Sequence, residues 1–168
     1  GGGTAIGGMG AWTQIRLAAP AVSGTRSGIW YAKRSGGVDI TAPTITGALD
    51  DWAVIAFLVR DADPTTFLDV AAGITSQSAT TQTPVCPSVT TTTADALIVR
   101  IATRDSTSNP RPPQPIGALL IAQTCDTNVS TNTNCSVSAY ATVQRSAGAT
   151  GTFTYYCTAN DGGLQATL

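Results

Sequence analysis

The chain has 168 residues and a net charge of −1, and its residues are 42% hydrophobic but only 11% charged. A disordered chain needs high charge and few apolar residues, so this composition predicts a folded protein, and the length suits one domain. The arginines are scattered singly, and no apolar stretch approaches the roughly 20 residues of a membrane span. Because nucleic-acid binding needs a clustered basic surface, we expect neither nucleic acid nor a membrane as a partner.

The residue types favour sheets over helices. The chain contains no histidine and no glutamate, and Lys33 is its only lysine. Exposed helix faces depend on Glu and Lys, whereas Thr and Val favour pleated sheets, so we predict an all-β fold. The composition also lacks the commonest acid–base groups, and we therefore expect no enzymatic activity, no catalytic residue and no cofactor.

In chain order, residues 1–10 form a glycine-rich lead, and residues 11–168 are predicted to be a single β-domain. The segments "SGIWYAKR" and "GVDIT" alternate apolar and polar residues around a Ser-Gly-Gly turn, which predicts a hairpin. Two runs, at 52–59 and 117–122, are apolar on both faces. Such runs are typical of central strands that are covered on both sides. For 52–59 a helix is the alternative, although the run is short and contains β-branched residues.

The stretch 73–87 is the longest without alternation, and it is predicted to be a surface loop or a crossover between two sheets. The segment "SVTTTTADALIVRI" that follows predicts an entry turn, made by the threonines and Asp95, and then an inner strand. Within this strand, Leu97, Val99 and Ile101 face one way, while Ile98, Arg100 and Ala102 face the other. The segments "CSVSAYATVQ" and "GTFTYYCTAN" also alternate. Short strands with turns about every ten residues predict a two-sheet antiparallel sandwich of the jelly-roll or immunoglobulin-like kind.

Four cysteines are candidates for disulfides. Zinc binding is disfavoured because the chain has no His and no Cys-x-x-Cys pair, and a nucleophilic cysteine needs a base. The even count and the polar loops suit an oxidising setting. We predict a bridge between Cys125 and Cys135 at the base of the loop between them, and a second bridge that ties Cys86 to Cys157. The other connectivities, a Cys86 bridge to a neighbouring subunit, and four reduced thiols are the alternatives.

Two further groups of residues are candidate sites. Asp61, Asp63 and Asp69 offer the oxygen ligands that calcium prefers. A strand exit followed by a polar turn explains the same residues, and we favour it, so no metal is expected. Tyr140 and Tyr156 fall on the polar faces of predicted strands, and these two aromatic residues are the candidates for a contact surface.

Most of residues 10–168 resembles a loose group of bacteriophage virion-associated β-sandwich proteins. The resemblance is carried, in order, by "GAWTQI", "GIWYAKR", "DWAVIAFLVRDADPTTFLDV", "PSVTTTTADALIVRI", "GATGTFTYYCTA" and the final "LQATL". In that group a Trp-Thr strand, a central strand ending in an aspartate-containing turn, and a threonine-rich entry to a "DALIV"-like strand recur.

The resemblance implies a non-enzymatic structural module on the surface of a virus particle, such as a capsid decoration protein or a component of the tail or a fibre. Its expected partners are shell or tail proteins and copies of itself. The alternative is an extracellular adhesin-like or carbohydrate-binding sandwich domain, for which a host-surface glycan would be the ligand.

Overall fold

The computed structural model describes residues 6–7, 12–18, 27–33, 40–42, 44–45, 53–63, 65–104, 117–125, 135–158 and 160–168. Throughout these residues the regular secondary structure is β-strand, and no helix occurs. The strands are β1 (Ile6–Gly7), β2 (Trp12–Ala18), β3 (Ser27–Ala32), β4 (Thr44–Ile45), β5 (Gly73–Thr81), β6 (Val85–Cys86), β7 (Thr90–Thr91), β8 (Ala96–Arg104), β9 (Leu119–Cys125), β10 (Ser136–Gln144), β11 (Gly148–Ala149), β12 (Phe153–Thr154) and β13 (Asp161–Thr167). The prediction of an all-β chain is confirmed.

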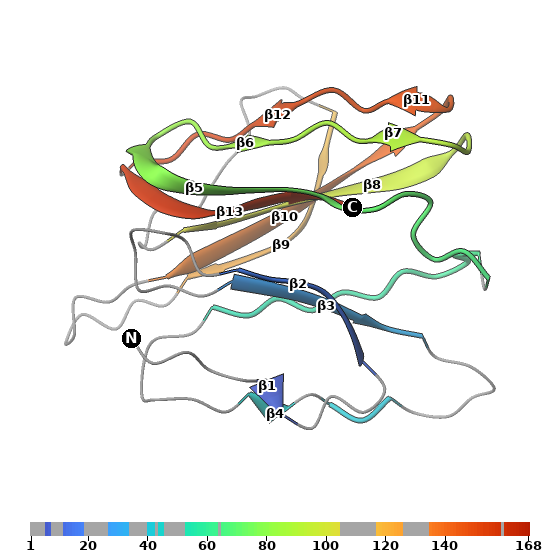
Figure 1. Ribbon diagram of the computed structural model, residues 1–168, viewed down its shortest axis with the longest axis horizontal. Helices are drawn as coiled ribbons and strands as arrows, with labels where there is room; N and C mark the ends of the chain where they lie inside the picture. Colours follow the sequence, from blue (N-terminus) through green and yellow to red (C-terminus); the bar gives the residue numbers. More distant parts are fainter. Residues whose placement is uncertain are drawn as a thin grey trace.

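One five-stranded antiparallel sheet, in the order β5-β13-β8-β10-β9, forms the centre of the molecule. The antiparallel hairpin β2–β3 lies on one side of this sheet. On the other side lies what we call the ribbon, in which β6 pairs with β12 and β7 with β11. Figure 1 shows the three parts stacked, with the ribbon above the sheet and the hairpin below it.

Alternation along β8 gives the central sheet two differently covered faces. The hairpin face carries Val99, Ile101, Val137, Ala139, Leu164 and Ala166, which form one core with Ile29 of the hairpin. The ribbon face carries Ala102 and Tyr140, which form a second core with Cys86 and Tyr155 of the ribbon segments. The predicted division of β8 into two faces is therefore confirmed, and each face has a buried part, with Val99 and Ile101 on one side and Ala102 on the other.

Three expectations about individual segments are wrong. The apolar run at 52–59, predicted as a central strand, joins no strand over its described part, residues 53–59. Ala53 and Ile55 pack against the core of the hairpin face while Val54 and Leu58 are exposed, so this run lies across the sheet and not within it. The second run becomes β9, but β9 is an edge strand with an exposed start.

The third expectation, that residues 73–87 are a surface loop or a crossover between two sheets, is wrong for residues 73–81, whereas residues 82–84 do connect the central sheet to β6 of the ribbon. Residues 73–81 form the nine-residue strand β5, which pairs with the C-terminal strand β13. The partner of β5 is distant in sequence, and an edge strand accepts Ser, Thr and Gln. The residues of β5 therefore show no alternation of apolar and polar side chains from which a strand could be predicted. The predicted hairpin turn at 35–37 lies outside the described residues, and β3 pairs with β2.

Candidate functional site

None of the four cysteines forms a disulfide, so the predicted staples are wrong. Cys86 is opposite Phe153 in the ribbon, whereas the amide of Cys157 donates to the carbonyl of Gln82 at 2.9 Å. The two cysteines are therefore about four residues, or roughly 13 Å, apart along the ribbon, which is too far for a bridge.

The other predicted pair fails for a different reason. Cys125 is directly opposite Ser136 in the sheet, and the side chains of directly opposite residues share a face. Cys135 precedes Ser136, and successive side chains along an extended chain point to opposite faces. Cys135, just outside β10, is thus offset by one residue from the position opposite Cys125, and the two sulfurs are not bonded.

Cys86 instead belongs to the second core. Its side chain is fully buried, and its thiol donates to the carbonyl oxygen of Ile101 at 3.5 Å. Burial raises the pKa of this thiol to about 12. A neutral, enclosed thiol packs like a small apolar side chain and is a poor nucleophile.

Asp63 and Asp69, two of the calcium candidates, accept hydrogen bonds in two separate turns. Asp63 accepts hydrogen bonds from the Thr65 hydroxyl at 2.6 Å, the Thr65 amide at 2.7 Å and the Thr66 amide at 2.9 Å. These bonds, that of the Thr65 hydroxyl above all, lower the pKa of Asp63 to about 2. Asp61 has a positive φ of 58° and continues the turn. The Asp63 carboxylate therefore caps the turn that it begins, which agrees with the polar turn that we favoured from the sequence.

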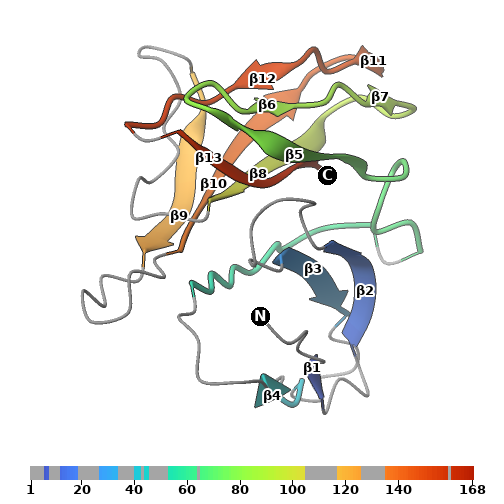
Figure 2. The same cartoon turned by 60° about the vertical axis from the view of Figure 1, so that its left-hand side comes forward.

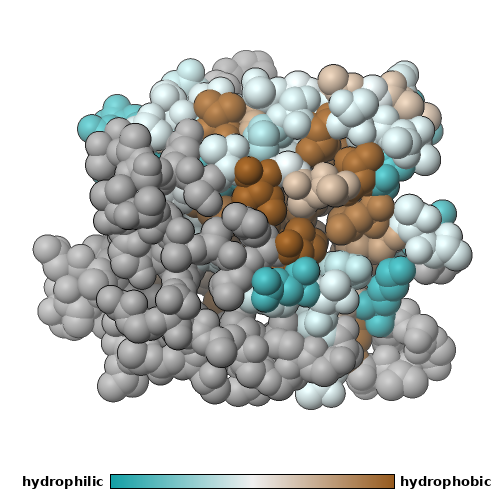
Figure 3. Space-filling model, in the orientation of Figure 1, coloured by the Kyte–Doolittle hydropathy of each residue, from teal (hydrophilic) through white to brown (hydrophobic). Residues whose placement is uncertain are grey.

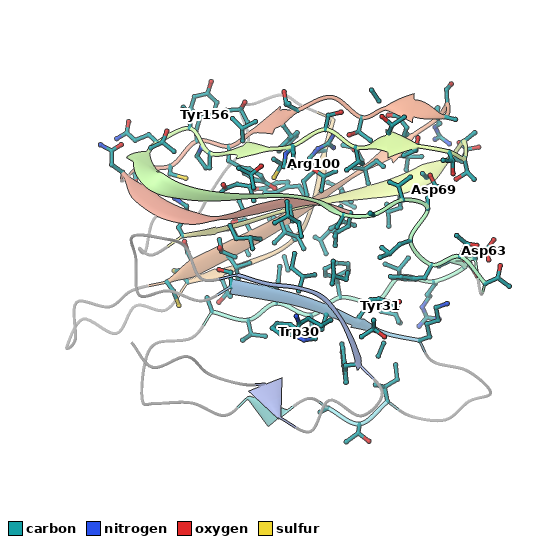
Figure 4. The ribbon with its side chains drawn as sticks, viewed as in Figure 1. Trp30, Tyr31, Asp63, Asp69, Arg100 and Tyr156 are labelled. Carbon is teal, nitrogen blue, oxygen red and sulfur yellow. The ribbon has the colours of Figure 1, made fainter. Side chains whose placement is uncertain are left out.

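Asp69 explains the threonine run before β8. Its carboxylate accepts bonds from the amide and hydroxyl of Thr92, at 2.5 and 2.6 Å, and from those of Thr93, at 3.3 and 3.0 Å. The hydroxyl and amide of Thr92 contribute most to lowering the pKa of Asp69. Asp63 and Asp69 lie at the same end of the molecule (Figure 4). The threonines thus attach the turn between β7 and β8 to the segment that leads into β5.

Of the two candidate contact tyrosines, one is buried and one is exposed. Tyr140 lies under the ribbon, with its ring centroid 5.8 Å from that of Tyr155, so its assignment to a contact surface is wrong. Alternation placed it correctly on the polar face of β10, but the ribbon covers that face. Tyr156 is 53% exposed and projects away from the ribbon (Figure 4).

The ribbon face contains a buried polar layer that the sequence did not suggest. Arg100 is buried between sheet and ribbon (Figure 4). Its guanidinium donates to the Thr142 hydroxyl at 2.9 Å and the Thr150 carbonyl at 3.0 Å, and lies 4.9 Å from the ring centroid of Phe153. Burial lowers the pKa of Arg100. Around Arg100 the layer consists of a backbone acceptor, a hydroxyl and an aromatic ring, so it is suited to joining the sheet to the ribbon.

The hairpin face contains an exposed apolar strip, which we define as Leu97, Leu119 and Val143. Leu97 is paired with Val143 across β8 and β10, and Leu119 is paired with Ala141 across β9 and β10, so all three residues share this face. They lie beyond the residues that Ile29 covers, and they are 43%, 72% and 47% exposed, respectively. Sequence alternation placed Leu97 and Val143 on an apolar face but could not show where the cover ends.

A groove of about 570 Å³ lies between the β2–β3 hairpin and the segment that enters β5. It is lined by Thr13, Gln14, Ile15, Tyr31, Leu68, Ala71, Ala72 and Ile74. The Tyr31 ring stacks on Phe67 with a centroid separation of 4.7 Å. Figure 3 shows apolar side chains bordering a hollowed seam between hairpin and sheet.

Within the described ranges no three Cys or Asp side chains are close enough to share a metal ion. The same residues include no helix long and apolar enough to span a bilayer. No family model, curated protein or solved structure matches this chain.

Proposed function

We propose that this protein is a non-enzymatic structural module on the surface of a virus particle, where it docks on neighbouring shell or tail proteins through the apolar strip. The exposure of Leu97, Leu119 and Val143 on one sheet face is the observation that carries the proposal. Contiguous exposed apolar side chains mark sites of protein–protein contact. The fold of such a module would be a β-sandwich of the jelly-roll or immunoglobulin-like kind.

Two properties of the chain support docking over chemistry. The reactive groups of the ribbon face are enclosed: burial raises the pKa of the Cys86 thiol and also that of the Tyr155 phenol. The strip itself is uncharged and is formed from three adjacent strands, so it is a rigid apolar surface. The resemblance to phage virion-associated sandwiches supplies the setting, which is extracellular.

The test is incorporation into particles. Particles carrying the chain would be purified on a density gradient, and the copy number would be compared for the wild type and a Leu97→Ser/Val143→Ser double variant. We expect the double variant to fall to a tenth of wild-type occupancy or less. Leu58→Ser is the matched control, because Leu58 is 70% exposed but lies outside the strip, and its occupancy should equal that of the wild type. Equal occupancy of the double variant, or absence of the chain from purified particles, would overturn the proposal.

The groove favours a second candidate function, binding of a neutral saccharide. Its volume lies within the range of small-ligand sites, and its lining combines apolar residues with the uncharged polar residues Thr13 and Gln14 and with Tyr31. Titration with neutral oligosaccharides, followed by amide chemical shifts, should then move the signals of these three residues. The shifts should vanish in Tyr31→Ala and persist in Tyr156→Ala; shifts that are absent in the wild type exclude this function.

A further inference from the structure

Among the residues that the structure describes, strand β9 forms an edge of the central sheet. Within the described part of the chain, β10 is its only strand neighbour. Alternate residues of an antiparallel edge strand direct their amide and carbonyl groups away from the sheet, so β9 presents one row of such groups outward. Figure 2 shows β9 along the margin of the sheet, at the left of the view.

The composition of β9 does not protect this edge. Natural edge strands are often shielded by lysine, by proline, by a β-bulge or by being very short; β9 has one register shift against β10, between Leu120 and Ala122. The seven residues of β9 read "LLIAQTC" and include neither a charged residue nor proline. Leu119 is 72% and Leu120 is 44% exposed, and Gln123 is also exposed. Because Leu119 and Leu120 belong to opposite faces, the start of β9 is apolar on both sides of the edge.

We infer that β9 pairs antiparallel with β9 of a second copy, so that two central sheets join into one continuous sheet. An antiparallel pair of identical strands is related by a two-fold axis, and each copy uses the same surface. The uncharged edge is complementary to itself, since no like charges meet across it. A net charge of −1 also means that two copies repel each other little.

Self-pairing is favoured over docking of a different chain because the edge carries no charge by which a charged partner could be selected. Self-pairing would also bring the apolar strips of the two copies together. Leu119 belongs to both the strip and β9, so the two strips would lie on either side of the paired β9 strands. The inference rests on the proposed function for its biological setting, namely assembly on a particle, but its test uses the isolated chain and different residues.

Sedimentation velocity over a range of concentrations tests the inference, with Gln123→Lys as the variant. A lysine at an edge position opposes strand addition, and the wild-type side chain is already exposed, so the fold should tolerate it. We expect the wild type to reach twice its 17.1 kDa mass with rising concentration, and the variant to raise the dissociation constant at least tenfold. Gln82→Lys makes the same charge change at an exposed turn residue and should leave the dissociation constant unchanged.

Hydrogen exchange identifies the surface involved. Amides of β9 in the wild type should exchange more slowly as the concentration rises, and this dependence should be lost in Gln123→Lys but kept in the Leu97→Ser/Val143→Ser double variant. A wild type that stays monomeric, or a dimer that Gln123→Lys leaves unchanged, overturns the inference. The two proposals can also fail separately. If the wild type dimerises as expected but the Leu97→Ser/Val143→Ser double variant has wild-type occupancy on particles, the proposed docking is refuted and the edge pairing is not.

Discussion

Replacing Gly163 of β13 should destabilise the fold, because this residue lies against the backbone of the neighbouring central strand β8. A Cβ atom built on Gly163 would lie 1.8 Å from the carbonyl oxygen of Thr103 and 2.8 Å from its carbonyl carbon. The nearest ordinary contact is 3.4 Å, so the two strands would have to separate by about 1.6 Å at this point. Thr103 meets the new atom with its backbone, which cannot rotate away as a side chain can.

The expected cost follows from these distances. Overpacking a core costs about 1–3 kcal/mol, and the rigid contact places Gly163→Ala at the upper end. Replacing glycine also removes about 0.4–1 kcal/mol of unfolded-state entropy, which leaves a net loss of roughly 2 kcal/mol. With a urea dependence of about 1–3 kcal/mol per molar, the unfolding midpoint should fall by about 1 M.

Urea unfolding followed by far-ultraviolet circular dichroism measures this loss, with Gly28→Ala as the control. A Cβ on Gly28 would also meet an atom at 1.8 Å, but that atom belongs to the ring of Trp30, a side chain that can turn aside. The control should therefore lose less stability than Gly163→Ala. Equal midpoints for Gly163→Ala and the wild type, or a larger loss in the control, would refute the close approach of β13 to β8.

Four other outcomes are expected. Tyr155→Phe should cost about 1–3 kcal/mol in urea unfolding, because the buried Tyr155 hydroxyl donates to the carbonyl of Arg100 at 2.9 Å; a loss below about 0.5 kcal/mol would contradict this bond. The native Cys86 thiol should react with iodoacetamide at pH 8 about a thousandfold more slowly than an ordinary thiol, since burial raises its pKa from 9.0 to about 12; mass mapping of the labelled sites measures this rate, and labelling as fast as at an exposed thiol would contradict it. Asp69→Asn should lower the melting temperature at pH 7, and the difference from the wild type should shrink below about pH 4. The reason is that a carboxylate with a lowered pKa stabilises the fold above its unfolded pKa of about 3.9, and this stabilisation is lost as the pH falls through its folded pKa. Melting curves at pH 7, 4 and 2.5 check this, and a difference that does not depend on pH counts against it. Gln165→Met should raise the free energy of unfolding by about 1 kcal/mol, because both polar atoms of the buried Gln165 amide have no hydrogen-bond partner; a loss of stability in urea unfolding would show that the amide is bonded in solution.

The sequence by itself determined the fold class and the faces of the central strands. A shortage of helix-favouring charged residues together with period-two alternation predicted an all-β chain, and the alternation along β8 and β10 correctly separated Val99 and Ala139 from Arg100 and Tyr140. These features are local, because side chains of an extended chain alternate whatever the strand later pairs with. The simple turn interpretation of Asp63 is local in the same way, since its partners are two and three residues away.

Only the tertiary structure decided which faces are covered and which distant residues meet. The ribbon buries Tyr140, a pairing distant in sequence makes a strand of residues 73–81, and Asp69 meets Thr92 across 23 residues. The predicted disulfide between Cys86 and Cys157 failed for the same reason, since strand register along the ribbon sets the separation of the two cysteines. The exposed strip, and the position of β9 at the edge of the sheet as far as the structure describes it, likewise depend on where the hairpin and the sheet end. The cover of each face comes from chain segments far away in the sequence, and alternation predicts the face on which a residue lies without predicting what covers that face.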